Sequence, residues 1–258
     1  MKQYTLQDLL DIMEQLRAGC PWDREQTYES LKRYVIEEAY EVVEAVDGTD
    51  KMALADELGD LLLQVVFYAQ IGKERGEFSM EDVLRCVCEK MIHRHPHVFG
   101  TEKAETSEEV LKNWAQIKQE EKGQTTQTQA LESISSSLPS LLRAQKVQER
   151  ASKVGFDWSD KEPVVDKLKE EIAEFIGAKT EQEREEEFGD LLFAAVNVGR
   201  FCGIQSEMAL QKGVNKFIHR FGEMEQLARE NGQQLSGMTA EEMDQLWNRV
   251  KAKEEPDR

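Results

Sequence analysis

The sequence predicts an all-α protein that contains one helical bundle twice, and three observations lead to that fold class. Apolar residues recur every three or four positions, which is the spacing of one helix face. Glycine and proline are few, at 16 and 5 of 258 residues, and no segment shows the strict alternation typical of a strand. Blocks of the first half also return in the same order in the second half.

Amphipathic segments mark the expected helices along the chain. Apolar stripes at residues 58–69 and 191–198 have the same helical spacing, one in each half. The sequence Asp-Gly-Thr-Asp at residues 47–50 predicts a turn between two helices of the first half. Further helices are expected at residues 8–16, 30–45, 80–92 and 108–118.

A polar segment divides the two halves. Residues 119–137 (QEEKGQTTQTQALESISSS) lack apolar periodicity and are the expected linker. The linker leaves an N-terminal domain at residues 1–118 and a C-terminal domain at residues 138–258. Each domain has about 120 residues, which is a common domain size.

The duplication consists of three pairs of blocks. The first pair contains Glu-Glu-x-x-Glu and then Glu-x-Gly-Asp-Leu-Leu, the second is Lys-x-Ile-His-Arg, and the third aligns Trp114 with Trp247. The shared order indicates a tandem repeat of one helical unit. The blocks lie at residues 37–62 and 170–192, at 90–94 and 216–220, and at 107–118 and 240–251.

The acidic positions of each repeat predict a cation site. Residues three apart share a helix face, so Glu38 and Glu41 form one carboxylate pair, and Glu57 and Asp60 form another. Two antiparallel helices would bring both pairs together, and such crowded charges repel unless a cation lies among them. Carboxylate oxygens suit Mg²⁺ or Mn²⁺. Because 51 of 258 residues are acidic, a solvated helix face is the alternative explanation, and the second copy of the pattern argues against it.

These elements, together with Cys-Pro-Trp-Asp at residues 20–23, resemble the MazG family of nucleoside triphosphate pyrophosphohydrolases over nearly the whole chain. The resemblance implies an all-α NTP pyrophosphatase fold, a homodimer, and Mg²⁺-dependent hydrolysis of NTPs or dNTPs, ATP included, to the monophosphate and pyrophosphate. Mn²⁺ is an expected substitute. The metal ligands implied by the resemblance are Glu38, Glu41, Glu57 and Asp60, and in the second half Glu171, Glu174, Glu187 and Asp190.

The implied chemistry is attack of a metal-activated water on the α-phosphorus. Glu38 or Glu171 is the expected proton acceptor. Cationic and aromatic side chains four residues apart are expected to contact the nucleotide, as equivalent residues do in the family. The alternative is that the basic side chains cover apolar helix faces and that the tryptophans pack in the core. The candidates are Lys90, Arg94, Trp114 and Lys118, and their counterparts Lys216, Arg220, Trp247 and Lys251.

Composition limits the possible partners. The 33 basic residues against 51 acidic ones give a net charge of -18, which disfavours nucleic-acid polymers and anionic membranes. The N-terminus has no secretory signal, and no apolar run approaches the roughly 18 residues of a membrane helix, so we expect a cytoplasmic protein. The scattered cysteines, Cys20, Cys86, Cys88 and Cys202, are expected to be reduced.

Two classes of function remain open from the sequence. One is a nucleotide-hydrolysing enzyme, and the other is a non-catalytic helical dimerisation or interaction module whose acidic clusters only bind cations. If the protein is an enzyme, the second half is the favoured main site because its acidic, Lys-Arg and Trp-Lys sets are all complete. The first half is complete as well, so the sequence does not exclude activity there.

Overall fold

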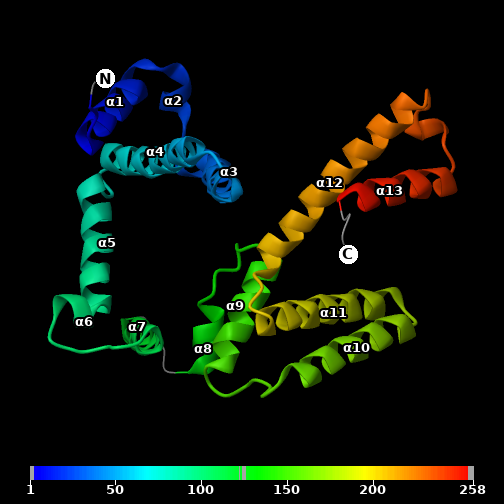
Figure 1. The fold of residues 1–258 in the computed structure, drawn as a ribbon. Helices are drawn as coiled ribbons and strands as arrows, with labels where there is room; N and C mark the ends of the chain where they lie inside the picture. Colours follow the sequence, from blue (N-terminus) through cyan, green and yellow to red (C-terminus); the bar gives the residue numbers. More distant parts are fainter. Residues whose placement is uncertain (1–2, 122, 124–125, 255–258) are drawn as a thin grey trace. The chain divides into compact units, whose positions relative to one another are not determined.

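The computed structural model describes residues 3–121, 123 and 126–254 (Figure 1). Within these residues the elements are thirteen α-helices and one short 3₁₀ helix, which confirms the all-α fold class. The chain divides into two compact units, Met1–Glu120 and Glu121–Arg258. The helices that begin in the first unit are α1 (Leu6–Gly19), α2 (Pro21–Glu25), α3 (Tyr28–Asp47), α4 (Lys51–Arg75), α5 (Met80–Arg94), α6 (Pro96–Phe99) and α7 (Ser107–Glu121).

Helices α3 and α4 pack as a hairpin in the first unit, and α4 also contacts α1 and α5 (Figure 1). The side chains of Thr27 and Asp50 cap the two helices by accepting from backbone N–H groups of the first turn. At the far end from the turn, the rings of Tyr28 and Tyr68 stack with centroids 5.8 Å apart, and the Tyr68 hydroxyl donates to the Tyr28 carbonyl oxygen. The connection at residues 48–50 confirms the predicted turn.

The core of the first unit lies where α1 and α5 pack against the α3–α4 hairpin. Helix α4 supplies most of the core, with four of its seven buried apolar residues. Burial of these side chains provides the main favourable contribution to folding of the unit. The buried apolar residues are Met13, Leu31, Val66, Phe67, Ala69, Ile71 and Met80.

Arg17, near the end of α1, fixes the short helix α2 against the rest of the unit. Its guanidinium donates to the main-chain oxygens of Asp23 and Gln26, and its Nε lies 3.0 Å from Oε1 of Glu74 near the end of α4. The Arg17 side chain is only 10% exposed. The hydrogen bond from Arg17 lowers the pKa of the Glu74 carboxyl. One buried cation therefore joins the ends of three helices.

The second unit repeats the central hairpin in α10 and α11 (Figure 1). Thr180 caps α11, and the rings of Phe175 and Phe188 lie 5.6 Å apart across the hairpin. Helix α9 packs on α11, where the Gln148 amide donates to the Phe193 carbonyl oxygen at 2.8 Å. The elements of this unit are α8 (Gln127–Glu132), α9 (Ser140–Ser152), α10 (Lys161–Gly177), α11 (Glu181–Phe201), α12 (Ser206–Glu230), η1 (Leu235–Gly237) and α13 (Ala240–Glu254).

Helices α12 and α13 share a second apolar cluster in this unit. The Gln145 side-chain oxygen accepts from the backbone N–H of Ser206, which joins the start of α12 to α9. Among the described residues no helix is long and apolar enough to cross a membrane. The buried members of the α12–α13 cluster are Met224, Leu227, Ala228, Leu246 and Val250.

The segment expected as a linker, residues 119–137, is partly helical. Helix α7 runs to Glu121, and Gln127–Glu132 forms α8. Ala130 is buried, and Arg150 of α9 donates to its carbonyl oxygen and to the Ser133 hydroxyl, the latter at 2.9 Å. A single turn and a half of helix carries too few apolar residues to show periodicity. Residues 122, 124 and 125 of this segment lie outside the described residues.

Replacing Arg17 with methionine is expected to lower the free energy of unfolding by about 3 kcal/mol, because Glu74 and two carbonyl groups lose their donor. Urea denaturation followed by circular dichroism measures this change. The exposed ion pair between Lys73 and Glu14 provides the control, since Lys73→Met should cost less than about 1 kcal/mol.

The same comparison has a defined pH dependence. The lowered pKa of Glu74 means that the ionic stabilisation is present above the unfolded-state pKa and is lost as the pH falls through the folded-state value. The difference between wild type and Arg17→Met should therefore shrink in acid. A difference that stays constant down to pH 2 would show that the ion pair contributes nothing.

Candidate functional site

Three carboxylates of the first unit converge on the α3–α4 hairpin, roughly two to three helical turns from its connection. One oxygen each of Glu38, Glu41 and Glu57 lies within 4.8 Å of the other two. Glu38 and Glu57 are half-buried and Glu41 is exposed, so the cluster opens to solvent. Asp60, the fourth predicted ligand, lies outside this group of three. The structure therefore brings together three of the four predicted side chains.

Crowding changes the proton affinity of this first cluster. Burial raises the pKa of Glu38, and the charges of Asp60 and Glu41 raise it further. Burial also raises the pKa of Glu57, followed by the charges of Glu41 and Asp60. Asp60 thus acts on the cluster electrostatically from outside the group of three. Carboxylates in this arrangement favour uptake of a proton or of a cation.

Gln64 is a neutral neighbour of the first cluster that the sequence analysis missed. It is 7% exposed, and its Nε2 donates to Oε1 of Glu38 over 3.5 Å, the long limit of a hydrogen bond. Its own Oε1 is buried without a hydrogen-bond partner in the structure. The available signal was its position seven residues after Glu57, which puts both on one face of α4. The amide orients the Glu38 carboxylate.

The second unit carries the corresponding cluster on α10 and α11. Oxygens of Glu171, Glu187 and Asp190 lie within 4.8 Å of one another. Glu171 is only 6% exposed, while Asp190 faces solvent. Burial raises the pKa of Glu187, and the charge of Glu174 adds to this effect. Glu174 lies outside the group of three, so this cluster also unites three of its four predicted ligands.

The two clusters differ in their nearest partners. The Nζ atom of Lys167 lies 2.7 Å from both the Glu170 and the Glu171 carboxylates, and these hydrogen bonds raise the pKa of Lys167. The repeat places Tyr34 at the equivalent position in the first unit. Lys167 was missed in the sequence, although a position four residues before Glu171 is a helical ion-pair spacing. The second cluster therefore has a cation of the chain beside its buried carboxylate.

The predicted phosphate-binding side chains of the first unit gather on α5 and α7. The Arg94 guanidinium lies 5.3 Å from the centre of the Trp114 ring, and Lys118 Nζ lies 5.1 Å from the same ring. Arg94 is nearly buried, and Lys90 is exposed one turn earlier. These contacts are cation–π interactions, which serve packing as well as ligand binding. The nucleotide role of these residues stays a prediction.

In the second unit the equivalent residues lie on α12 and α13. The Trp247 ring is 5.2 Å from that of Phe217 and packs against the α12–α13 core. Lys216 is exposed, whereas Arg220 and Lys251 are half-buried. The packing alternative therefore applies to Trp247, since one side of its ring is already covered. The basic side chains lie on helices other than those that carry the carboxylates.

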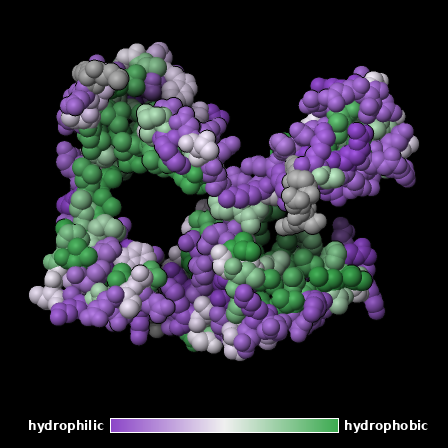
Figure 2. Space-filling model, in the orientation of Figure 1, coloured by the Kyte–Doolittle hydropathy of each residue, from purple (hydrophilic) through white to green (hydrophobic). Residues whose placement is uncertain are grey.

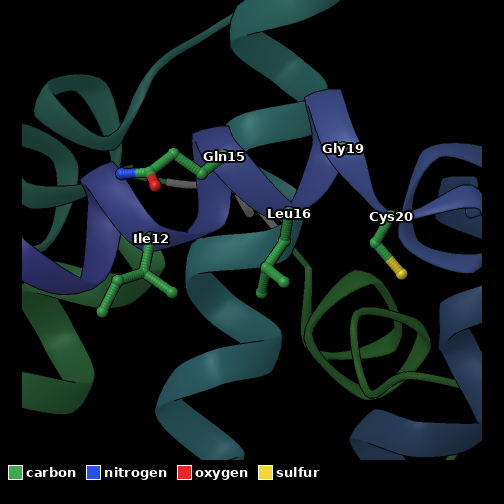
Figure 3. Close-up of a pocket in the computed structure, with 5 residues that line it drawn as sticks. All are labelled: Ile12, Gln15, Leu16, Gly19 and Cys20. Carbon is green, nitrogen blue, oxygen red and sulfur yellow. The ribbon is translucent and has the colours of Figure 1, made fainter.

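An apolar depression of about 340 Å³ lies on α1, away from the predicted ligands (Figure 3). Ile12, Gln15, Leu16, Gly19 and Cys20 line it, and the Leu16 and Cys20 side chains point to the same side. Its lining offers no charged group for a phosphate or a cation. The predicted ligands do not line this depression.

The fold and the clusters together define a class of protein: an all-α chain whose duplicated helix hairpins each present carboxylates suited to a hard divalent cation. Comparison with known proteins specifies this class further. Residues 26–99 match the MazG nucleotide pyrophosphohydrolase domain. The chain belongs to the MazG family, which confirms the resemblance found in the sequence.

The similarity to relatives extends over nearly the whole chain. Over 251 residues the chain is 47% identical to the nucleoside triphosphate pyrophosphohydrolase/pyrophosphatase MazG of Thermotoga maritima, covering 96% of each protein. It is 48% identical over 254 residues to the nucleoside triphosphate pyrophosphohydrolase of Escherichia coli K12, covering 95% of this chain and 97% of that protein. A crystal structure of a mazG-related protein from Thermotoga maritima shares 32% identity over 44% of this chain and 99% of that chain, with a TM-score of 0.40.

Removing one charge from the first cluster should stabilise the metal-free protein. Because the pKa of Glu38 is raised in the folded state, its contribution to stability is present below the unfolded-state pKa and is lost as the pH rises through the folded-state value. Glu38→Gln removes this loss, so at pH 8 in EDTA its melting temperature should exceed that of wild type by about 2–4 °C. Differential scanning calorimetry from pH 4 to pH 8 measures the effect.

The control is Glu102→Gln, which changes an exposed acid of the same unit that lies outside the cluster. This variant should melt like wild type at every pH. If Glu38→Gln is destabilised at pH 8 instead, the carboxylate is held by favourable contacts and the repulsion argument is wrong.

Proposed function

We propose that this protein hydrolyses nucleoside triphosphates to the monophosphate and pyrophosphate, with Mg²⁺ held by the carboxylates of the helix hairpins. The observation that carries the proposal is the presence of one carboxylate cluster in each unit, each with three carboxylate oxygens within 4.8 Å of one another. The names of the near full-length relatives support the same reaction. Mn²⁺ is the expected substitute, since it accepts the same oxygen ligands.

The donor set fits a small hard cation. All three members of each group are carboxylates, and their raised pKa values at Glu38, Glu57 and Glu187 reflect burial and charges that a cation would compensate. Glu38, Glu41 and Glu57 would hold the ion in the first unit, with Asp60 completing the set. Glu171, Glu187 and Asp190 would do so in the second, with Glu174. Bound Mg²⁺ supplies neutralisation of phosphate charge and activation of water.

Side chains of the protein would accept the proton that the attacking water releases and would position the substrate. Water forms a bond from its oxygen to the α-phosphorus, the bond from that phosphorus to the bridging oxygen breaks, and pyrophosphate leaves with the electron pair. Glu38, whose pKa is raised and whose carboxylate is oriented by Gln64, accepts the proton in the first unit. Glu171 has the same position in the second repeat.

The identity of the products tests the reaction. With ATP and Mg²⁺ in H₂¹⁸O, phosphorus NMR should show AMP and pyrophosphate, with the label in AMP, because attack occurs at the α-phosphorus. Glu38→Gln and Glu171→Gln, made separately, should each lower turnover at their own site by at least about 100-fold. The larger loss in total activity is expected for Glu171→Gln.

The alternative function is a non-catalytic helical module with cation-binding clusters. ADP with orthophosphate, or no reaction, would exclude the proposed hydrolysis and favour that module. If both single variants keep full turnover, the assignment of the carboxylates is wrong even when the products are right.

We also propose that the protein acts as a homodimer through apolar faces of the hairpins. Leu58 and Leu62 on α4 are 48% and 41% exposed, and their repeat equivalents Phe188 and Leu192 on α11 are 48% and 41% exposed. Figure 2 shows hydrophobic residues gathered over these hairpin regions. A Cβ added to Gly59 would meet no atom within 4 Å, so a neighbouring chain has room to approach closely. Extended apolar patches of this kind mark protein interfaces.

Placing a charge on this face should weaken association. Leu62→Glu buries an unpaired carboxylate in the dimer, so sedimentation equilibrium should show at least about a 10-fold rise in the dissociation constant. Met52→Glu is the matched control, because Met52 is an exposed apolar residue of the same helix outside the Leu58–Leu62 face. A wild-type protein that sediments as a monomer at micromolar concentration would contradict the proposal.

A further inference from the structure

Gln64 carries a buried amide oxygen that the proposed reaction has not used. The side chain is 7% exposed, and its Nε2 lies 3.5 Å from Oε1 of Glu38. Its own Oε1 is buried and has no hydrogen-bond partner among the described residues. A buried oxygen without a donor opposes folding, because it has given up its hydrogen bonds to water and gained none in return. This position therefore suits a small donor that enters the site.

The carboxylate of Glu38 sets the orientation of the Gln64 amide. A side-chain amide has N–H donors on one side and an oxygen acceptor on the other. Turning the amide over would place its oxygen against a carboxylate oxygen, and two acceptors repel each other. Nε2 therefore faces Glu38, and the amide oxygen is held next to it with its lone pairs available.

Gln64 lies where the acidic cluster meets the apolar core. It follows Asp60 by four residues and Glu57 by seven, and positions four and seven apart share one face of a helix. The nearby residues Val66 and Phe67 of the same helix belong to the buried core. Hydrogen bonds at such a boundary are stronger than in bulk water, because the surroundings have a lower dielectric constant.

A water molecule is the donor that fits both oxygens. The Gln64 Oε1 atom and an ionised Glu38 carboxylate are both acceptors, so neither can donate to the other. Because Nε2 and Oε1 belong to one amide group, the free oxygen lies close enough to Glu38 for a single water to bridge the two. Such a water donates one O–H group to each side chain. Its lone pairs then stay free to form a bond.

We propose that Gln64 is a positioning residue that holds the attacking water between its Oε1 atom and the Glu38 carboxylate. The inference rests on the proposed function, because it takes a nucleotide to lie at the first cluster. The water oxygen forms its bond to the α-phosphorus while the bond from phosphorus to the bridging oxygen breaks, and one water proton passes to Glu38. The other proton stays on the oxygen, hydrogen-bonded to Gln64, and leaves with the monophosphate.

This arrangement belongs to the first repeat. At the position equivalent to Gln64 the second unit has Ala194, whose methyl group cannot accept a hydrogen bond. Its buried carboxylate, Glu171, has Lys167 beside it at 2.7 Å instead. Only the first cluster is therefore expected to respond to changes at Gln64.

Methanol tests the positioning of the water, because it has a single O–H group and cannot donate to both side chains. In a Glu171→Gln, Glu187→Gln background that disables the second cluster, phosphorus NMR measures AMP and AMP methyl ester formed from ATP and Mg²⁺ in aqueous methanol. With Gln64 present, AMP should dominate, since methanol leaves the amide oxygen unpaired. Gln64→Met should raise the ratio of ester to AMP by about 10-fold or more. It should also lower kcat by about 100-fold and keep KM within about twofold, because the nucleotide contacts are unchanged.

A crystal structure of the metal-free, full-length protein provides a readout that does not depend on activity. An ordered water within hydrogen-bond distance of both Gln64 Oε1 and Glu38 is expected in the wild type and not in Gln64→Met. The control is Gln70→Met, because Gln70 donates to Glu74 at 3.1 Å on the same helix, away from the cluster. This variant should keep the water, the product ratio and kcat.

Three results would overturn the inference. The first is a wild-type structure without the bridging water, and the second is an unchanged product ratio in Gln64→Met, which would limit Gln64 to orienting Glu38 even if kcat falls. The third is an active wild type whose activity disappears in the double-variant background, which would place hydrolysis in the second cluster alone. Each of these leaves the proposed reaction intact, whereas a wild type that releases no pyrophosphate would contradict the proposed function as well.

Discussion

Mutual repulsion among carboxylates is the constraint on which the rest of the structure depends. Both hairpins bring three acidic side chains within 4.8 Å, an arrangement that opposes folding in the absence of a cation. The apolar core beneath α3 and α4, the caps at Thr27 and Asp50 and the buried Arg17 network supply compensating stability. The site is therefore pre-formed, and the repulsion among its carboxylates lowers the stability of the metal-free protein. A bound cation removes this repulsion, which strengthens cation binding to the folded state.

The two repeats differ in the groups that lie beside their carboxylates and reduce the repulsion. In the second unit, Lys167 places a positive charge 2.7 Å from the most buried carboxylate, Glu171. In the first unit the half-buried Glu38 has a neutral amide from Gln64 at 3.5 Å, and Tyr34 takes the position of the lysine. Duplication thus kept the acidic residues, but the third member of the close group differs, Glu41 in the first unit and Asp190 in the second, and the residues around the acids diverged in charge. The two sites share ligands but differ in the surroundings that a nucleotide would meet.

The sequence predicted the periodic parts of the molecule and missed the parts that depend on tertiary contacts. Helical spacing gave α3, α4 and α11 and the turn between the first two, and the repeat gave both acidic groups. Asp60 and Glu174 fell outside the groups of three because side-chain reach depends on how the two helices are rotated. Helix α8 was missed because its burial depends on Arg150, 20 residues away. Gln64 and Lys167 were missed although their helical spacing from Glu57 and Glu171 was present in the sequence, because many other polar residues have such spacings and only the structure shows which of them make contact.

The directions in which the side chains of α4 point connect two features at opposite ends of the helix, the acidic cluster and the Arg17 network. Its first half carries Glu57 and Asp60, and its last turn carries Glu74, which holds Arg17 and through it α2. Each residue of an α-helix turns the chain by about 100°, so one inserted or deleted residue between Asp60 and Glu74 would aim Glu74 away from Arg17 while the carboxylates stayed in place. An insertion of about four, seven or eleven residues, which is close to one, two or three whole turns, would bring Glu74 back to nearly the same direction. The number of residues in α4 between Asp60 and Glu74 is therefore restricted to nearly whole helical turns. One end of this stretch must face the acidic cluster, and the other must face Arg17, which holds α2.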